Sequence, residues 1–229
     1  MSLQERKEWL LSALRSSELD QAHEDHLLSR GASLFDLKRD GVVTFNVPET
    51  PCPDPIFSSR YGERMEAFEG RVIFPLFSVQ GDLLGFEWRE GDTKKKVFLS
   101  DNETRAVFLG MPSEMMGVWK LRKVWLVEGA MSRYALKRAT PLPVLGAATA
   151  NVSEPQLRFL ERFVDVVYCA FDQDSAGDMG FFSARKKLSR KDLRFERVKY
   201  GVKGDDPAKV WDRGGLPLLN ENFGGIEWL

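Results

Sequence analysis

The spacing of apolar residues changes near residue 120. Before that point, leucines recur among charged residues over 3–30 at helical intervals, and a second short helix is expected before Gly41. Strand-like runs separated by Gly-Asp turns follow at 71–79, 83–89 and 96–100. Short strands with turn signals between them predict a small antiparallel sheet in the first half of the chain.

After residue 120, apolar runs alternate with amphipathic segments. Strands are expected at 124–129, 141–146, 164–172 and 193–200, with helices at 131–139, 153–163, 176–188 and 206–214. Strand and helix alternating four times predict a mainly parallel sheet in its own domain. The fold class expected is therefore α/β, with an α+β N-terminal subdomain over 1–119, a parallel-sheet domain over 120–215 and a C-terminal tail over 216–229.

Composition indicates the cellular compartment and the kinds of partner, but not the reaction. The 229 residues are 43% hydrophobic, which is enough to bury a core, and the formal net charge is −1. A nucleic acid would then have to be held by a local patch or through metal ions. Cys52, in a proline-rich stretch, and Cys169, in an apolar run, form neither a disulfide framework nor a zinc ribbon, so no zinc is expected. With no signal peptide or membrane span in view, a cytoplasmic protein is expected.

Acidic residues follow three of the four strands of the second half. Glu128 ends the first strand, Asp172 and Asp174 end the third, and Asp205 and Asp206 follow the fourth. Ligands bind beyond the carboxyl ends of parallel strands, so these side chains should meet at one edge. Gathered carboxylates repel one another, and a hard divalent cation such as Mg²⁺ removes that cost. The pattern predicts a magnesium site that supports phosphoryl chemistry.

Helix capping is the alternative interpretation of the Asp-x-Asp pair. Asp174 or Ser175 could cap the helix that follows, and the spacing Ser175-x-x-Asp178 fits a capping box, so we expect Ser175 to be the cap. Capping leaves Asp172 unexplained. An EF-hand loop is excluded, because Ala176 and Ser183 stand where it needs acids.

Two motifs together resemble the toprim domain, the metal-binding module shared by DnaG-type primases, type IA and II topoisomerases and some nucleases. VWLVEG matches its strand ending in Glu-Gly, with Glu128 and Gly129, and CAFDQDSAG matches its Asp-x-Asp-x-x-Gly, with Asp172, Asp174 and Gly177. This resemblance implies a Rossmann-like fold for the second half.

The first half narrows the resemblance to one of these families. FEGRVIFPLFSVQGDLLGFEWR, KKVFLSDNETRAVFLG and HLLSRGASLFDLKRDGVVTF are similar to successive stretches of DnaG-type primases. From about residue 20 to 215, the chain thus resembles the primase catalytic core, and we expect it to lack the zinc-binding and helicase-binding domains. Topoisomerases and toprim nucleases share only the second half.

The resemblance implies roles for individual residues. Glu128, Asp172 and Asp174 would be catalytic; Glu128 would ligate metal or act as general acid or base. Asp172, Asp174 and Asp206 would hold Mg²⁺ or Mn²⁺ on a nucleoside triphosphate, with Asp205 as a further candidate. The basic residues implied to face template or nucleotide phosphates are Arg71, Arg89, Lys94, Lys95 and Lys96. For each of these, a solvated surface charge is the alternative.

The function implied is a DNA primase that makes short RNA primers on single-stranded DNA from nucleoside triphosphates. A replicative helicase, or a zinc-module protein acting in trans, would be a further partner. The chain departs from the family at Ser132, where an Asp is usual, and at Ala147, which replaces a Thr. These departures keep two alternatives open: a weak or inactive primase-like accessory protein of replication, and a toprim nuclease.

Overall fold

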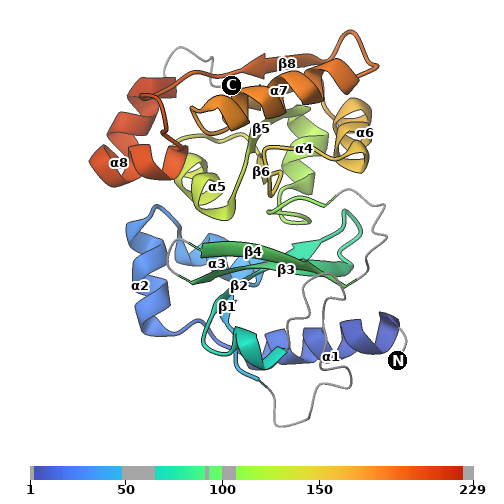
Figure 1. Cartoon of the computed structure of the whole chain (residues 1–229), viewed down its shortest axis with the longest axis vertical. Helices are drawn as coiled ribbons and strands as arrows, with labels where there is room; N and C mark the ends of the chain where they lie inside the picture. The colour runs from blue at the N-terminus through green and yellow to red at the C-terminus, as the bar shows by residue number, and fades with distance from the viewer. Residues whose placement is uncertain (1–2, 48–64, 91–92, 100–106, 224–229) are drawn as a thin grey trace.

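The computed structural model describes residues 3–47, 65–90, 93–99 and 107–223. The proline-rich loop expected at 48–55, with Cys52, lies outside them. Figure 1 shows a lower layer built from the first half of the chain and an upper layer built from the second half.

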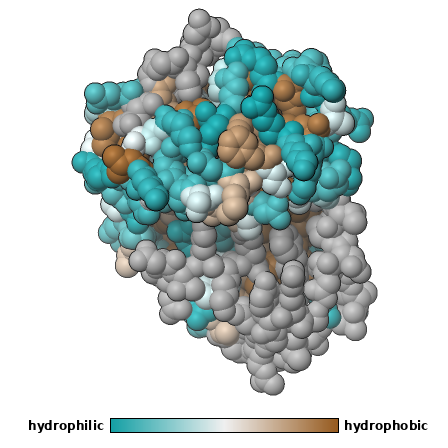
Figure 2. Space-filling view, turned by 45° about the horizontal axis from the view of Figure 1, so that its top comes forward, coloured by the Kyte–Doolittle hydropathy of each residue, from teal (hydrophilic) through white to brown (hydrophobic). Residues whose placement is uncertain are grey.

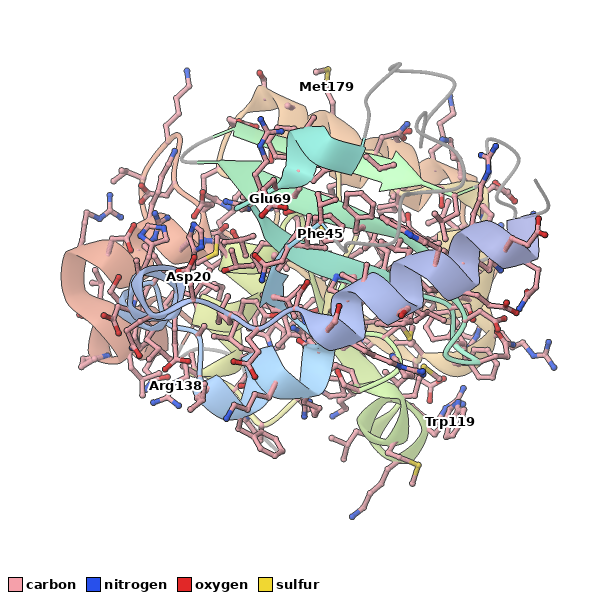
Figure 3. All side chains as sticks on the ribbon, turned by 90° about the horizontal axis from the view of Figure 1, so that it is seen from below. Asp20, Phe45, Glu69, Trp119, Arg138 and Met179 are labelled. Carbon is pink, nitrogen blue, oxygen red and sulfur yellow. The ribbon has the colours of Figure 1, made fainter. Side chains whose placement is uncertain are left out.

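The helix expected over 3–30 is two helices, α1 (Leu3–Ser16) and α2 (Gln21–Ser29). The single-helix prediction is wrong because Asp20, labelled in Figure 3, starts a new helix. Its carboxylate accepts a hydrogen bond from the His23 amide at 2.8 Å. The second short helix is confirmed as α3 (Leu34–Asp40), and Gly41 ends it with a φ of 71°.

The small antiparallel sheet is confirmed. Its strands run in the order β1 (Val43–Thr44), β2 (Val72–Phe77), β3 (Leu83–Glu90) and β4 (Thr93–Phe98), with a 3₁₀ turn at Met65–Phe68 before β2. Alternate residues of β2 face opposite sides, as the pleat requires. Phe74 joins the core shared with the second half, whereas Ile73 packs with α1.

The second half contains the parallel sheet that was expected. Its four strands are β5 (Lys123–Val127), β6 (Val144–Gly146), β7 (Val166–Cys169) and β8 (Arg194–Arg197), in the order β6-β5-β7-β8. The helices between them are α5 (Ala130–Lys137), α6 (Glu154–Phe163) and α7 (Ser175–Lys187). Because all pairings are parallel, the carboxyl ends of the strands share one edge.

The last helix, α8 (Pro207–Phe223), is longer than the sequence pattern indicates. It continues past a kink at Gly215, whose φ is 65°, so residues 216–223 are helical where we expected a tail. Phe223 is 1% exposed and packs on Trp125 and Tyr200, with ring centroids 5.0 and 4.9 Å apart. This segment therefore completes the core of the second half.

The two halves share one core. A single cluster of buried side chains joins Leu27 and Phe74 of the first half to Trp125 and Tyr134 of the second. An unpredicted helix, α4 (Met115–Leu121), crosses the expected boundary at 119 and 120. The domain limits stay a prediction. Within the described ranges, no helix is both long enough and apolar enough to cross a membrane.

Candidate functional site

Glu128 and Asp172 meet at the carboxyl edge of the parallel sheet. Glu128 follows β5 and Asp172 follows β7, two strands that pair in register at Leu126 and Cys169. The amide of Asp172 donates a hydrogen bond to Oε1 of Glu128 at 3.1 Å. Glu128 is 9% exposed and Asp172 is half-buried. The structure therefore brings together the two acids that the strand pattern placed at this edge.

Sterics explain why the last residue of the Asp-x-Asp-x-x-Gly motif is a glycine. A Cβ atom on Gly177 would lie 2.2 Å from the carbonyl oxygen of Asp172, closer than any contact allows. The same carbonyl accepts a hydrogen bond from Arg197 at 2.7 Å, and Arg197 also donates to the carbonyl of Phe171 at 2.7 Å. The turn carrying Asp172 is thus fixed from two sides.

Asp174, not Ser175, caps α7. Its carboxylate accepts a hydrogen bond from the Gly177 amide at 2.8 Å, and Ser175 is the exposed first residue of the helix. The prediction of Ser175 as the cap is therefore wrong, because the helix begins one residue earlier than expected. Asp178 is not part of a capping box; it pairs with Arg197 and Lys199 at 3.1 and 2.5 Å.

Asp172 and Asp206 both lie near the phenol of Tyr200. The Tyr200 hydroxyl is buried against the carbonyls of Ala170 and Phe171, at 3.2 and 3.1 Å. Burial raises the pKa of Tyr200 well above its usual value, and the negative charges of Asp172 and Asp206 raise it further. Asp206 also accepts a hydrogen bond from the Lys209 amide at 2.8 Å, at the start of α8.

Asp205 is held inside its own loop. It is 4% exposed, and Arg213 donates to both of its carboxylate oxygens while the Val202 amide donates to one of them. The hydrogen bonds from Arg213 lower the pKa of Asp205, so the carboxylate is charged and already compensated. The carbonyl of Asp205 accepts from the Gln173 amide at 2.7 Å, which ties this loop to the Asp-x-Asp turn. We interpret Asp205 as a residue that positions the loop; ligation by it stays a prediction.

The described residues include no group of three or more Asp, Glu, His or Cys side chains that could hold a metal ion as they stand. Of the acids expected to meet at this edge, Asp174 bonds to the Gly177 amide of its own helix and Asp205 bonds to Arg213, so their part in a metal site stays a prediction. The donor chemistry nonetheless fits a hard cation. The Glu128 carboxylate accepts a hydrogen bond from the backbone amide of Asp172, so the two residues lie next to each other at this edge, and the negative charges of Asp172 and Asp206 both act on Tyr200.

An open groove of about 740 Å³ lies beside this edge. It is lined by Gln173, Asp174, Lys199, Tyr200 and Lys203, among others. Of the two lysines in this lining, Lys199 pairs with Asp178 at 2.5 Å and Lys203 is exposed. The sequence reasoning did not single out these lysines, Tyr200 or Arg197, because none belongs to a recognisable motif.

The basic residues predicted in the first half gather at one end of the antiparallel sheet. Arg89 pairs in register with Val72 and with Lys94, which places Arg71 next to them. The Arg71 guanidinium lies 4.1 Å from the ring centre of Trp88, and Arg89 pairs with the fully buried Glu87 at 3.3 Å. The side chains of Lys94, Lys95 and Lys96 fall outside the description.

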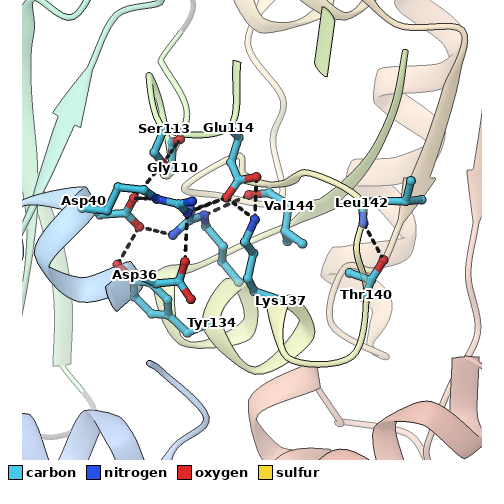
Figure 4. A network of polar contacts seen from close by, with 12 residues as sticks. Asp36, Asp40, Gly110, Ser113, Glu114, Tyr134, Lys137, Thr140, Leu142 and Val144 are labelled. Atoms are coloured by element: carbon cyan, nitrogen blue, oxygen red, sulfur yellow. Dashed lines mark hydrogen bonds and ion pairs between the residues drawn. The ribbon is translucent and has the colours of Figure 1, made fainter. Parts of the chain in front are cut away.

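A buried network of charged residues, also missed by the sequence reasoning, joins the two halves (Figure 4). Arg133 of α5 is 1% exposed and donates to Asp40 at the end of α3, to Glu114 at 3.0 Å and to the Val144 carbonyl at 2.9 Å. Lys137 also donates to Glu114, at 2.7 Å. Ser132, the residue at the usual Asp position, is buried on the same helix and offers no carboxylate.

Comparison with known proteins agrees with this geometry. Residues 125–211 match the family model described as Toprim-like. A DNA primase of Lactococcus lactis subsp. lactis is 24% identical over 235 residues, which cover 91% of this chain and 36% of that protein. The chain therefore spans about a third of the length of this curated relative.

Solved structures show the same fold. The zinc-binding and RNA polymerase domains of the Aquifex aeolicus primase match with a TM-score of 0.75 at 19% identity, covering 96% of this chain and 62% of that one. The DnaG primase catalytic domain bound to ssDNA matches with a TM-score of 0.72 at 16% identity, covering 97% of this chain and 80% of that one.

The fold and the strand-end acids define a toprim-like domain in the second half of the chain. Along nearly its whole length, the chain is related to the catalytic core of the DnaG-type DNA primases. The resemblance first drawn from VWLVEG and CAFDQDSAG is thereby confirmed.

Proposed function

We propose that this chain is the catalytic core of a DNA primase, a DNA-dependent RNA polymerase that makes short RNA primers on single-stranded DNA. The observation that carries the proposal is the hydrogen bond from the Asp172 backbone amide to the Glu128 carboxylate, which places the two acidic residues next to each other at the edge shared by β5 and β7. It occurs in a chain whose two halves both match primase cores in fold. A nuclease would need only the second half.

Glu128, Asp172, Asp174 and Asp206 are the residues that would hold Mg²⁺ or Mn²⁺. A bound divalent ion would neutralise charge on the phosphates of a nucleoside triphosphate. In this proposal Glu128, which is largely buried, acts as general acid or base. Arg197 donates to the carbonyl of Asp172, and the Asp172 amide donates to Glu128, so the backbone that carries the Asp172 side chain is fixed beside Glu128. Asp174 would have to serve the ion while it caps α7, and the Asp174 variants in the Discussion separate these two roles.

The basic groups supply two phosphate-facing surfaces in this proposal. Lys199 and Lys203, in the groove beside the acids, face the triphosphate. Arg71, Arg89 and Lys94 to Lys96, on the antiparallel sheet, face the template strand. Phosphate contacts of this kind position a nucleic acid without reading its sequence.

The test is primer synthesis by the purified chain. Single-stranded DNA, labelled nucleoside triphosphates and either Mg²⁺ or Mn²⁺ are incubated with wild type, Asp172→Asn and Asp192→Asn, and the products are separated on a sequencing gel. Asp192 is an exposed acid at the opposite end of β8, so its variant controls for loss of one charge. We expect short RNA products from wild type and Asp192→Asn and none from Asp172→Asn.

A primase-like accessory protein is the second candidate. It is favoured by Ser132, by the commitment of Asp174 to the α7 cap and by the commitment of Asp205 to Arg213. No products, with the template intact, would support this candidate or a requirement for a zinc-module protein or helicase in trans, which adding such proteins would resolve. Cleaved template would instead indicate a nuclease.

A further inference from the structure

The segment from Arg185 to Arg194 is strongly basic. Its ten residues include six basic side chains, at positions 185, 186, 187, 190, 191 and 194, and one acid, Asp192. The first three end α7, and the others form the turn into β8 and its first residue. The segment lies at the start of β8, whereas the acids of the candidate site lie near the end of that strand.

Internal ion pairs account for only part of this charge. Arg190 pairs with Asp165 at 2.7 Å and with Asp192 at 2.9 Å, and it donates to two carbonyls as well. By contrast Arg185, Lys186, Lys187 and Lys191 are exposed, and within the described chain none of the four has an ion-pair partner. The dipole of α7 favours basic residues in its last turn, but Lys191 lies beyond the helix.

A groove of about 770 Å³ runs between the end of α7 and β8. Arg185, Lys191 and Arg194 contribute to its lining together with the apolar side chains of Phe181, Leu188 and Phe195. Phe181 and Phe195 stack with ring centroids 5.4 Å apart and form an apolar floor. Figure 2 shows the upper face of the molecule as mainly hydrophilic with hydrophobic side chains set among them.

The strand that borders the groove has an open edge. β8 is the last strand in the order β6-β5-β7-β8, and no described strand pairs with its other side. The amide of Arg194 donates to the carbonyl of Asp165, just before β7, and the amide of Val198 donates to the carbonyl of Cys169 in β7, both at 3.0 Å. In a parallel ladder the alternate residues, Phe195 and Arg197, direct their backbone groups away from the sheet. An extended peptide could therefore lie along this edge.

We propose that this groove, between α7 and β8, binds an extended acidic peptide segment of a partner protein. The acidic side chains would face Arg185 and Lys191 of the groove lining and Lys187 in the adjoining last turn of α7, and apolar side chains between them would pack toward the apolar floor. A peptide suits the groove better than a nucleic acid, because the open edge of β8 offers backbone hydrogen bonds that an extended main chain can complete. The carboxylate of Glu196, which also lines the groove, is paired with Arg194 at 2.6 Å. The inference does not depend on the proposed polymerase activity.

The test measures binding of a fluorescent synthetic peptide in which Asp and Leu alternate, by anisotropy at low salt. The groove variant is Arg185→Glu, Lys187→Glu, Lys191→Glu. The control variant, Lys38→Glu, Lys120→Glu, Arg138→Glu, makes the same change in net charge at exposed residues outside the groove. Thermal unfolding of all three proteins establishes that each is folded.

We expect the groove variant to raise Kd at least about tenfold, since three exposed ion pairs of ordinary strength are lost, and the control to leave it within about twofold. Binding should also weaken as salt rises. Equal loss in both triple variants, or no binding by wild type, would overturn the proposal. A single-stranded oligonucleotide that binds more tightly than the peptide, with the same dependence on the three residues, would overturn it in favour of a nucleic-acid surface.

Discussion

Arg133 donates a hydrogen bond to Glu114 at 3.0 Å, and both side chains are almost completely buried. Burial by itself lowers the pKa of Arg133, but Asp40 and Glu114 outweigh it and raise that pKa above its usual value. A buried ion pair adds little net stability relative to an apolar pair, whereas removing one partner leaves the other charge uncompensated. The packing of α5 against the first half therefore depends on the side chain of Arg133.

Replacing Arg133 by Met should lower the free energy of unfolding by about 3–5 kcal/mol, because Asp40 and Glu114 would stay buried without their cation. Urea denaturation followed by tryptophan fluorescence measures the loss. Arg138→Met, at the exposed residue that ends the same helix (Figure 3), should change it by less than about 0.5 kcal/mol. An equal loss of unfolding free energy in the two variants would show that the charged network does not stabilise the contact between the two halves.

The two roles of Asp174 can be separated by choice of substitution. Asp174→Ala removes the cap of α7 and should cost about 1 kcal/mol of stability, whereas Asp174→Ser keeps a capping oxygen and should cost much less. If Asp174 also serves the proposed reaction, both variants should lose primer synthesis by at least about a hundredfold. Full synthesis by Asp174→Ser would mean that the residue is a cap alone.

Asp165 should make stability depend on pH. Hydrogen bonds from Arg122, at 2.7 Å, and from Arg190 lower the pKa of Asp165. A group whose pKa is lower in the folded state stabilises the fold above its unfolded pKa of about 4, and this contribution is lost as the pH falls. Asp165→Asn should thus lower the unfolding midpoint at pH 7 and should differ progressively less from wild type below pH 4. The side chains are partly exposed, so the effect is modest.

A double-mutant cycle checks this cause. In a protein that already carries Arg122→Met and Arg190→Met, adding Asp165→Asn should no longer change the pH dependence of the unfolding midpoint. A persistent difference would trace the effect to other partners of Asp165.

Cys169 should be unreactive in the folded protein. Burial within β7 raises the pKa of its thiol to about 12, so the thiolate is scarce at neutral pH and no reagent reaches it. In a Cys52→Ser background, iodoacetamide at pH 8 should label Cys169 only after unfolding in guanidinium, which mass spectrometry detects. Rapid labelling of the native protein would contradict the packing described for this strand.

The sequence predicted the features that depend on the spacing of apolar residues over short stretches of the chain. Alternation and turn signals located both sheets, and the rule that parallel strands end at one edge placed Glu128 beside Asp172. The break between α1 and α2 escaped prediction because leucines continue at helical spacing across the Asp20 cap. α4 was missed because its seven residues are too few to show a period.

Residue partners far apart in the chain could not be predicted in this way. Arg213 neutralises Asp205 from a later turn of α8, and Asp40 meets Arg133 from the other half of the molecule. Neither pairing leaves a spacing signal, since each depends on how whole elements pack. For Asp174 and Asp205 the expected convergence of the acids stays a prediction, because their carboxylates bond to the Gly177 amide and to the Arg213 guanidinium.

The final turn of α8 has a consequence for the turn that holds Asp172. Leu219 and Phe223 lie on the inner face of the second half, and Phe223 contacts both Trp125 of β5 and Tyr200, which sits under the Asp172 turn. These apolar residues carry no ionisable group, and they pack beneath the turn that holds Asp172. If this edge carries out the proposed reaction, substitution of Leu219 or Phe223 would change the activity without replacing any of the acids.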